Sequence, residues 1–492
     1  MSARTWVAFA LPVVASVLPL ACGEDVVAPP APATDASTPP SGVARTDPDA
    51  VHVEGATFRD GRGRQLLFRG YNAKVAPIFD VTFDDGRAPT QTVLSFDEAG
   101  ATRFEELGFN VLRLPVSWSG LEPKPREYPE AFLAKIGEVL AMAKRHRFYV
   151  IVDMHQDAYS KEIGEDGAPL WAIVPPPSML LAGPYDDARR TSEGALNAGY
   201  SFFANANATD GRPLQEAFVA AVQKIAQRYV GDPTVLGYEA FNEPVELSQD
   251  RLDAFHERFA NGVHAIDRDA PILFEPLVFR NQTDQSVVPS EPWRHGPGAY
   301  SPHVYTGQFS IPSQNGWQSE DPAVLEPSMT KAAAEAAAWQ TPLFVTEFGC
   351  DQSLARGPKW LAAELDLQDR NLASSTAWVW AETGSWGLRK SDNTENAATA
   401  RTMARSFPRA VAGDLLAIER PTPTHLRVRY RATARTRGLP HEVSASLAYA
   451  THYRASCDGA SVAISTETGR VTFVCPATEG DHVFELVGDP LP

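Results

Sequence analysis

The sequence predicts an α/β chain in which a (β/α)8 TIM barrel precedes a smaller antiparallel β-sandwich. From about residue 50 to 405, short apolar runs alternate with amphipathic stretches, as expected for parallel strands joined by crossover helices. Eight candidate strands can be counted, at residues 66–71, 110–114, 149–154, 235–241, 272–275, 299–303, 343–346 and 376–380. Eight such units in this length of chain favour a closed barrel. The alternative is an open doubly wound sheet, which is weakened because no glycine-rich phosphate loop follows the first strand.

The stretches between these strands have the periodicity of helices that pack on a sheet. In residues 214–229, Leu214, Phe218 and Val222 recur on one face, and Lys224 points away from it. The connection over residues 160–212 is long for a barrel loop, and loops of this length are often functional. Because it follows the third strand, we expect it to lie over the catalytic face.

The pattern changes after Pro408. Leu426, Val428 and Tyr430 alternate with arginines, and similar short runs follow, punctuated by Pro and Gly. Period-two alternation in short segments is typical of antiparallel sheets. We therefore expect a barrel over residues 49–405 and a β-sandwich over residues 406–492.

The N-terminus resembles a bacterial lipoprotein signal over residues 1–22. Arg4 precedes an apolar stretch that is short for a membrane span, and the stretch ends at Cys22, which would be the lipidated residue. Pro19 departs from that pattern, so an ordinary secretory leader is the alternative. Residues 23–48 are rich in Pro and Ala and should form a disordered tether. The sequence therefore predicts an exported protein, either a cell-envelope lipoprotein held at a membrane surface or a secreted one.

Composition excludes one class of partner. The chain has 492 residues, of which 43% are hydrophobic and 21% charged, an ordinary globular balance. Its net charge of -17 argues against nucleic acid as a partner, because few groups would neutralise phosphates.

The sequence predicts three different states for the four cysteines. Export implies an oxidising compartment, so Cys457 and Cys475, which are close in the chain, are expected to form a disulfide. Cys350 is expected to be a small buried hydrophobe, because no histidine base is evident beside it. Cys22 belongs to the signal segment.

Two glutamates about a hundred residues apart carry most of the functional information. Glu243, in Asn242-Glu243-Pro244, ends one predicted strand, and Glu347, in Glu347-Phe348-Gly349, ends another. Catalytic groups of barrel enzymes stand at the carboxyl ends of strands. Hydrolysis of a glycosidic bond with retention needs an acid for the leaving oxygen and a carboxylate nucleophile roughly 5 Å away.

These segments, together with Arg113-Leu114-Pro115 and His303-Val304-Tyr305, resemble glycoside hydrolase family 5 over about residues 50 to 405. The resemblance implies that Glu243 is the acid/base and Glu347 the nucleophile. It implies that Asn242 binds the sugar 2-hydroxyl. It also implies substrate-site roles for the remaining matched residues, which are Arg113, His155, His303, Tyr305 and Trp380. Of these, Arg113 and Tyr305 would contact the nucleophile, and Trp380 would stack on the reacting sugar.

Within this family, the segment 153–157 and the segments 167–172 and 407–413 resemble endoglycoceramidases. These enzymes cut the bond between an oligosaccharide and ceramide, and their relatives include glucosylceramidases and steryl glucosidases. The resemblance implies that Asp157 and Lys74 contact sugar hydroxyls. Residues 171–181 are apolar and are expected either to line a groove for a lipid-like aglycone or to pack on the barrel.

The leading hypothesis is therefore a retaining β-glycosidase that acts on glycolipid-like β-glycosides and needs neither a cofactor nor a metal. One alternative is a β-glucosidase or diglycosidase whose substrates carry another apolar aglycone. The non-enzyme alternative is a carbohydrate-binding surface lipoprotein, which the joint presence of the two glutamates, Arg113 and Tyr305 disfavours.

Overall fold

The computed structural model describes residues 42–184, 187–284, 286, 289, 291–308, 321–476 and 478–491. The predicted signal segment 1–22, with Cys22, and residues 23–41 of the predicted tether lie outside the described residues. The prediction of a disordered tether is wrong for residues 42–48, because Arg45 is buried and ion-pairs with Asp267 at 2.8 Å. No helix in the described parts of the chain is both long and apolar enough to cross a membrane.

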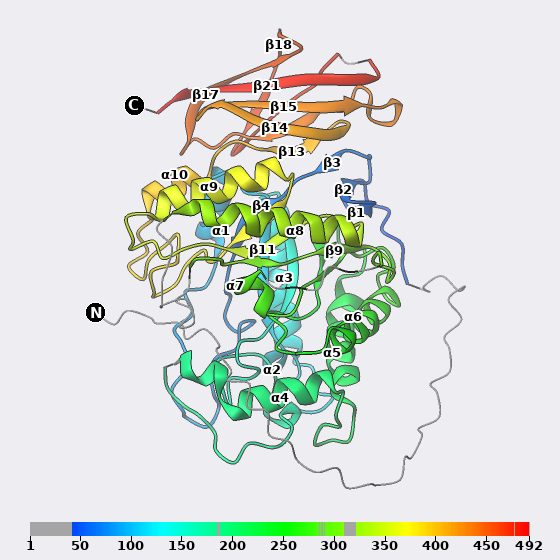
Figure 1. Ribbon diagram of the computed structural model, residues 1–492, viewed down its shortest axis with the longest axis vertical. Coiled ribbons are helices and arrows are strands. Elements are labelled where there is room, and N and C mark those ends of the chain that lie inside the picture. The colour runs from blue at the N-terminus through cyan, green and yellow to red at the C-terminus, as the bar shows by residue number, and fades with distance from the viewer. Residues whose placement is uncertain are drawn as a thin grey trace.

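Parallel strands form the barrel at the centre of the molecule (Figure 1). In sheet order they are β10 (His303–Val304), β11 (Phe344–Phe348), β12 (Ser374–Ala377), β4 (Arg69–Asn72), β5 (Val111–Ser117), β6 (Tyr149–His155), β7 (Val235–Glu239), β8 (Ile272–Phe274) and β9 (Gly298–Tyr300). β9 and β10 are two parts of one stave, separated by Ser301 and Pro302. A parallel bridge between Tyr300 and Leu343 links this stave to the one that contains β11, which completes the ring. The predicted eight-stranded barrel is confirmed.

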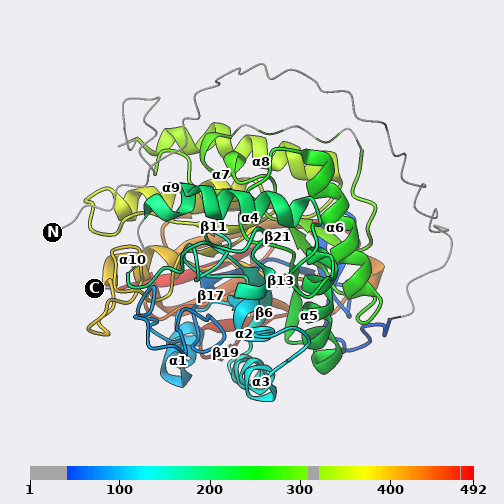
Figure 2. The same ribbon diagram turned by 90° about the horizontal axis from the view of Figure 1, so that it is seen from below.

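Helices surround the barrel, as the view in Figure 2 shows. They are α1 (Glu98–Glu106), α2 (Trp118–Leu121), α3 (Glu130–Arg145), α4 (Glu193–Phe203), α5 (Leu214–Tyr229), α6 (Gln249–His264), α7 (Phe279–Thr283), α8 (Leu325–Trp339), α9 (Gly357–Arg370) and α10 (Ala397–Met403). Side-chain caps begin several of them: Asp97 accepts the backbone N–H of Gly100 in α1, and Ser192 accepts that of Ala195 in α4. The predicted apolar face of α5 is buried.

Two antiparallel sheets pack at one end of the barrel, opposite α2 and α4 (Figure 1). One has the order β1 (Val51–Glu54), β2 (Thr57–Asp60), β3 (Gln65–Leu66), β13 (Pro408–Val411), β16 (His441–Ser444), β20 (Arg470–Phe473) and β19 (Ser465–Glu467). The other has the order β14 (Asp414–Thr422), β15 (His425–Ala432), β21 (Gly480–Pro490), β17 (Ala450–Cys457) and β18 (Ala460–Val462). The expected C-terminal sandwich is present.

The domain boundary differs from the prediction at the N-terminal side. The sequence predicts residues 51–66 as part of the barrel, but β3 pairs with β13, so β1 to β3 extend the C-terminal sheet. Their apolar side chains, such as Phe58, pack with Phe344 and other residues at the amino ends of the barrel strands. These strands therefore close the bottom of the barrel and join it to the sandwich, because their apolar faces are buried only between the two.

The cysteines follow the sequence analysis where the structure describes them. Cys457 and Cys475 form a disulfide within the core of the sandwich. Cys350 is buried and unbridged, and burial raises the pKa of its thiol to about 12. It is therefore a thiol at neutral pH and not a nucleophile.

Strand register places the polar residues of the site at one level. His303 lies beside Glu347 across β10 and β11, and Asp153 lies beside Glu239 across β6 and β7. Because the strands are parallel, all these side chains come from the carboxyl half of the barrel, the end opposite the sandwich.

Candidate active site

The two predicted catalytic glutamates face one another at the carboxyl end of the barrel. One carboxylate oxygen of Glu243, one of Glu347 and one ring nitrogen of His303 all lie within 4.8 Å of one another. The backbone of Glu243 has φ +44°, in the left-handed region that residues other than glycine rarely adopt. Such backbone outliers concentrate at functional sites, where surrounding contacts hold them in place.

The carboxylate of Glu347 is held at both oxygens. Arg113 Nη1 donates to Oε1 at 2.6 Å, and the hydroxyl of Tyr305 donates to Oε2 at 2.8 Å. Burial and the charge of Glu347 raise the pKa of Tyr305 well above its ordinary value, so the phenol keeps the proton that it donates. The carboxylate is therefore fixed in orientation by two charge-assisted hydrogen bonds.

Arg113 connects the nucleophile candidate to the rest of the site. It is completely buried, yet its pKa stays well above the ordinary value, because Asp153, Glu239 and Glu347 outweigh the effect of burial. Its guanidinium also donates to the side-chain oxygen of Asn242 at 2.8 Å. Asn242 in turn donates to the backbone oxygen of Gln156 at 3.0 Å. These bonds set the orientation of Asn242 beside Glu243.

The two oxygens of Glu243 have different surroundings. His303 Nδ1 lies 2.9 Å from Oε1, and the amide of Asn281, from α7, donates to the same oxygen at 3.5 Å. Arg190 Nη1, from the 3-10 turn η2 (Asp187–Thr191) in the long loop, lies 3.8 Å from Oε2. The side chain of Glu243 is 12% exposed, so it is the more accessible of the two catalytic candidates.

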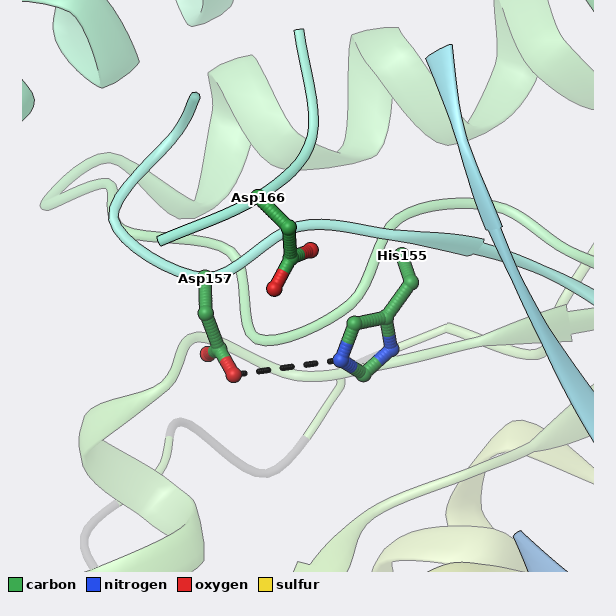
Figure 3. Close-up of side chains that lie close together, drawn as sticks. All are labelled: His155, Asp157 and Asp166. Carbon is green, nitrogen blue, oxygen red and sulfur yellow. Dashed lines mark ion pairs between the residues drawn. The ribbon is translucent and has the colours of Figure 1, made fainter. Parts of the chain in front are cut away.

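A second polar cluster adjoins the catalytic pair. Figure 3 shows the ring of His155 and the carboxylates of Asp157 and Asp166 facing one another. His155 Nδ1 lies 2.7 Å from Asp153, and Nε2 lies 3.8 Å from Asp157. Arg190 donates to Asp157 at 2.8 Å. Asp166 arrives here because a backbone bridge joins it to Asp157 and folds the intervening loop back on the barrel.

Charge explains how this buried cluster is tolerated. Burial alone would lower the pKa of His155, but Asp153 and then Asp157 outweigh it, so the pKa is raised well above the ordinary value. Burial would raise the pKa of Asp157, but Arg190 and His155 lower it overall. Burial raises the pKa of Asp166 well above its usual range, despite the opposing effect of His155. The cluster thus offers both charged and neutral groups to a polar ligand.

Lys74 and a tryptophan complete this side of the site. Lys74 Nζ donates to the side chain of Gln91 at 2.7 Å and lies 4.9 Å from the centre of the Trp378 ring. The ring of Trp378 is parallel to that of His155, with centres 5.5 Å apart. Lys74 and His155 therefore both contact the ring of Trp378.

The structure corrects the prediction for Trp380. Its side chain is 2% exposed and packs edge-on against Tyr71 and Phe96 in the core between α1 and the barrel. The half-buried Trp378, two residues earlier, faces the site instead. β12 ends at Ala377, so strand alternation does not determine the direction of either side chain.

The apolar segment at residues 171–181 divides into two parts. Trp171 is buried, stacks edge-on against Trp118 and donates to the backbone oxygen of Glu122 at 3.0 Å. Met179 and Leu180 are 69% and 39% exposed. The first part thus packs on the barrel, and the second presents apolar surface.

The fold also brings into the site several residues that were not predicted, namely Glu165, Asp166, Arg190, Glu275 and Asn281. For one of them a signal existed. Glu275 ends a candidate strand and precedes Pro276, the same pattern that identified Glu243. The others lie in loops or in a short helix, whose positions the local sequence does not indicate.

Three clusters of histidine and carboxylate side chains in the described chain have ligand atoms within 4.8 Å of one another: His155, Asp157 and Asp166; Glu239, Glu275 and His303; and Glu243, His303 and Glu347. Arg190 ion-pairs with Asp157 in the first cluster. Arg113 lies 3.5 Å from Glu275 in the second and 2.6 Å from Glu347 in the third. Because a guanidinium group lies within ion-pair distance of at least one acid in each cluster, we assign the clusters to the polar site and not to a metal.

Comparison with protein-family models matches residues 89–384 to the cellulase family, glycosyl hydrolase family 5. The chain belongs to this family. The family is one of glycoside hydrolases, and membership accounts for the barrel fold.

Two curated relatives and one solved structure are similar to much or part of the chain. A glucosylceramidase from Aspergillus fumigatus is 27% identical over 243 residues, which cover 39% of this chain but only 32% of that protein. Endoglycoceramidase I from Rhodococcus hoagii is 25% identical over 453 residues, covering 86% of this chain and 85% of that protein. Endo-glycoceramidase II from Rhodococcus sp., solved with ganglioside GM3, has a TM-score of 0.74 at 21% identity, covering 89% of this chain and 100% of that one. At that identity, the likeness shows the fold alone.

Proposed function

We propose that this protein is a retaining β-glycosidase that hydrolyses the bond between glycan and ceramide in glycosphingolipid-like substrates. The spacing of Glu243 and Glu347 carries the proposal. Carboxylate oxygens within 4.8 Å of one another agree with the separation of about 5–5.5 Å for retaining enzymes. Inverting enzymes need about 6.5–9.5 Å, because a water molecule stands between the sugar and the base.

In the first step, Glu347 attacks the anomeric carbon while Glu243 protonates the leaving oxygen, which gives a glycosyl-enzyme ester. In the second step, Glu243 removes a proton from water, whose oxygen displaces Glu347 from that carbon. Arg113 and Tyr305 orient the nucleophile throughout. Asn242, held by Arg113, is placed to bind the 2-hydroxyl, a contact that strengthens as the ring becomes oxocarbenium-like.

The substrate class is inferred from two kinds of side chain in and around the site. Lys74, His155 and Asp157 suit the hydroxyl groups of a sugar. On the loops that follow β6 and β7, large apolar side chains are exposed, namely Leu170, Met179, Leu180 and Leu247. A polar glycone and an apolar aglycone match this division. The similarity to endoglycoceramidase I over most of the chain supports the same class.

A second candidate is a β-glucosidase or diglycosidase for glycosides with another apolar aglycone. The similarity to the Aspergillus glucosylceramidase favours it, because that name implies a single sugar on the lipid. The two candidates share the chemistry and differ in how much glycan the site accepts.

Product analysis by mass spectrometry separates these candidates. The protein is incubated with a ganglioside, with glucosylceramide and with an aryl β-glucoside, beside the Glu347→Gln variant as a matched control. Release of intact oligosaccharide and ceramide supports the first proposal. Cleavage of only the monosaccharide substrates supports the second, and equal product from wild type and variant contradicts both.

The acid/base role has its own test. Glu243→Gln should lose activity on natural glycosides but keep it on substrates whose leaving group needs no protonation, and azide should then yield a glycosyl azide. Full activity of this variant on ganglioside would contradict the role.

We also propose that the protein is exported and anchored through lipidated Cys22, which would place it at a membrane that displays glycolipids. Replacement of Cys22 by Ser should release the protein from the membrane fraction of its producing cells. An unchanged distribution would favour a cleaved secretory leader instead.

A further inference from the structure

A third glutamate lies directly behind the acid/base candidate. Glu275 follows β8 and is 1% exposed. Its Oε2 accepts a hydrogen bond from the backbone N–H of Glu243 at 3.2 Å. Its Oε1 lies 3.2 Å from Nε2 of His303, whose Nδ1 lies 2.9 Å from Oε1 of Glu243. The imidazole of His303 thus lies between the carboxylates of Glu275 and Glu243.

We propose that Glu275 is a positioning residue that controls the protonation of Glu243 through His303. The inference rests on the proposed function, because it assumes that Glu243 is the acid/base. It goes further in assigning a role to a residue outside the catalytic pair, and that role concerns the pH range of activity rather than the chemistry itself.

The charges around Glu243, His303 and Glu275 couple the protonation of these three groups. The acidic groups here are Asp153 from β6, Glu239 from β7, Glu275 after β8, Glu347 from β11 and Glu243. The cations are Arg113 from β5, Arg190, which lies 3.8 Å from Glu243, and His303 from β10. Burial lowers the pKa of His303, but Glu275 and Glu347 outweigh it and raise the pKa well above its ordinary value. Acids outnumber cations, so the buried cluster retains protons that isolated carboxyl groups would lose.

Burial favours the protonated form of Glu275. Burial raises its pKa to about 8, although His303 and Arg113 oppose the shift, and burial also raises the pKa of Glu239. Glu275 is consequently neutral near pH 7 and becomes an anion as the pH rises through about 8. A new negative charge on the far side of the imidazole disfavours ionisation of Glu243 and keeps its proton in place.

The reaction itself requires no net transfer along this path. Glu243 gives its proton to the glycosidic oxygen when the C–O bond breaks and regains one from the attacking water. Glu275 and His303 set only the fraction of free enzyme in which Glu243 carries the proton. Their effect should therefore be seen in the pH dependence of kcat/KM.

The test is Glu275→Gln in the full chain, with kcat/KM measured against pH. Glutamine keeps the shape and the acceptor for the Glu243 N–H but cannot ionise. With a glycoside whose leaving group needs protonation, we expect the alkaline limb to move to lower pH by about one unit, the effect of one charge at this distance. With a glycoside whose leaving group needs none, the limb should stay in place. Glu246→Gln is the control, because this buried glutamate bonds the backbone N–H groups of Leu247 and Ser248 and does not touch His303.

The outcomes are distinguishable. An alkaline limb that stays within about 0.2 units of wild type, or a loss of kcat/KM that is equal at every pH, overturns the inference. If Glu275→Gln does not fold, Glu275→Asp retains the charge but withdraws it from His303, and an unchanged limb in that variant overturns the inference. If Glu243→Gln keeps full activity on the first glycoside, the proposed function fails instead.

Discussion

Tyr305→Phe removes one hydroxyl group and isolates the hydrogen bond to Oε2 of Glu347. That bond is 2.8 Å long, and Oε2 is also the oxygen 3.6 Å from His303, so its loss frees one side of the carboxylate to rotate. A hydrogen bond to a charged group is worth about 1.5–3 kcal/mol. If the bond orients and ionises the nucleophile, its loss should lower kcat/KM by about 10- to 150-fold.

The assay is kcat/KM on an aryl β-glucoside, together with the melting temperature. The melting temperature should change by less than about 4 °C, since no packed atoms other than one oxygen are removed. Tyr149→Phe is the matched control: its hydroxyl donates to the backbone oxygen of Asp49 at the opposite end of the barrel. A variant with kcat/KM within about twofold of wild type would refute the role of Tyr305.

Four further variants test the site, the core and the sandwich. Trp378→Ala should raise KM with little change in melting temperature. Trp380→Ala should destabilise the fold by about 3–5 kcal/mol in urea unfolding, because only Trp380 is packed in the core. The reverse pattern would contradict the placement of the two rings. Burial raises the pKa of Glu364 well above its ordinary value, and within the described chain neither carboxylate oxygen has a hydrogen-bond partner. The folded state therefore holds a proton on Glu364 that the unfolded chain releases above about pH 4.5, so the free energy of unfolding should fall as pH rises from there through the raised pKa. Glu364→Gln should reduce this fall, measured by melting curves at pH 5 and 9. An equal fall in both proteins would contradict this prediction. Replacing Cys457 and Cys475 by serine should lower the free energy of unfolding of the sandwich by about 3 kcal/mol, because the bridge spans 18 residues. The change is measured as a lower midpoint of unfolding. An unchanged midpoint would show that the bridge does not contribute to stability.

Much of the fold could be predicted from the sequence. Apolar runs at strand spacing, alternating with helical periodicity, are local patterns, and eight of them require a parallel closed sheet to bury their faces. The positions of Glu243 and Glu347 could be predicted with them. Glu243 follows β7 and Glu347 lies near the end of β11, and parallel strands bring their carboxyl ends to one face.

Other features depend on contacts between segments that are far apart in the chain. Residues 51–66 look like the start of the barrel, but their partner, β13, lies more than three hundred residues later. Trp378 and Trp380 are indistinguishable by local pattern, and only the apolar space beside α1 takes one of them into the core. A local pattern indicates which face is apolar, but not which distant surface will cover it.

The sequence by itself determined the barrel and the strand-end carboxylates, because backbone geometry and hydrophobic burial link local periodicity to fold. Only the tertiary structure decided what surrounds these carboxylates. Asn281 and Arg190 reach Glu243 from a short helix and a long loop, and Glu275 reaches it through His303. Distances of 3–4 Å between such groups depend on how whole elements pack, and they in turn set which carboxyl groups hold protons.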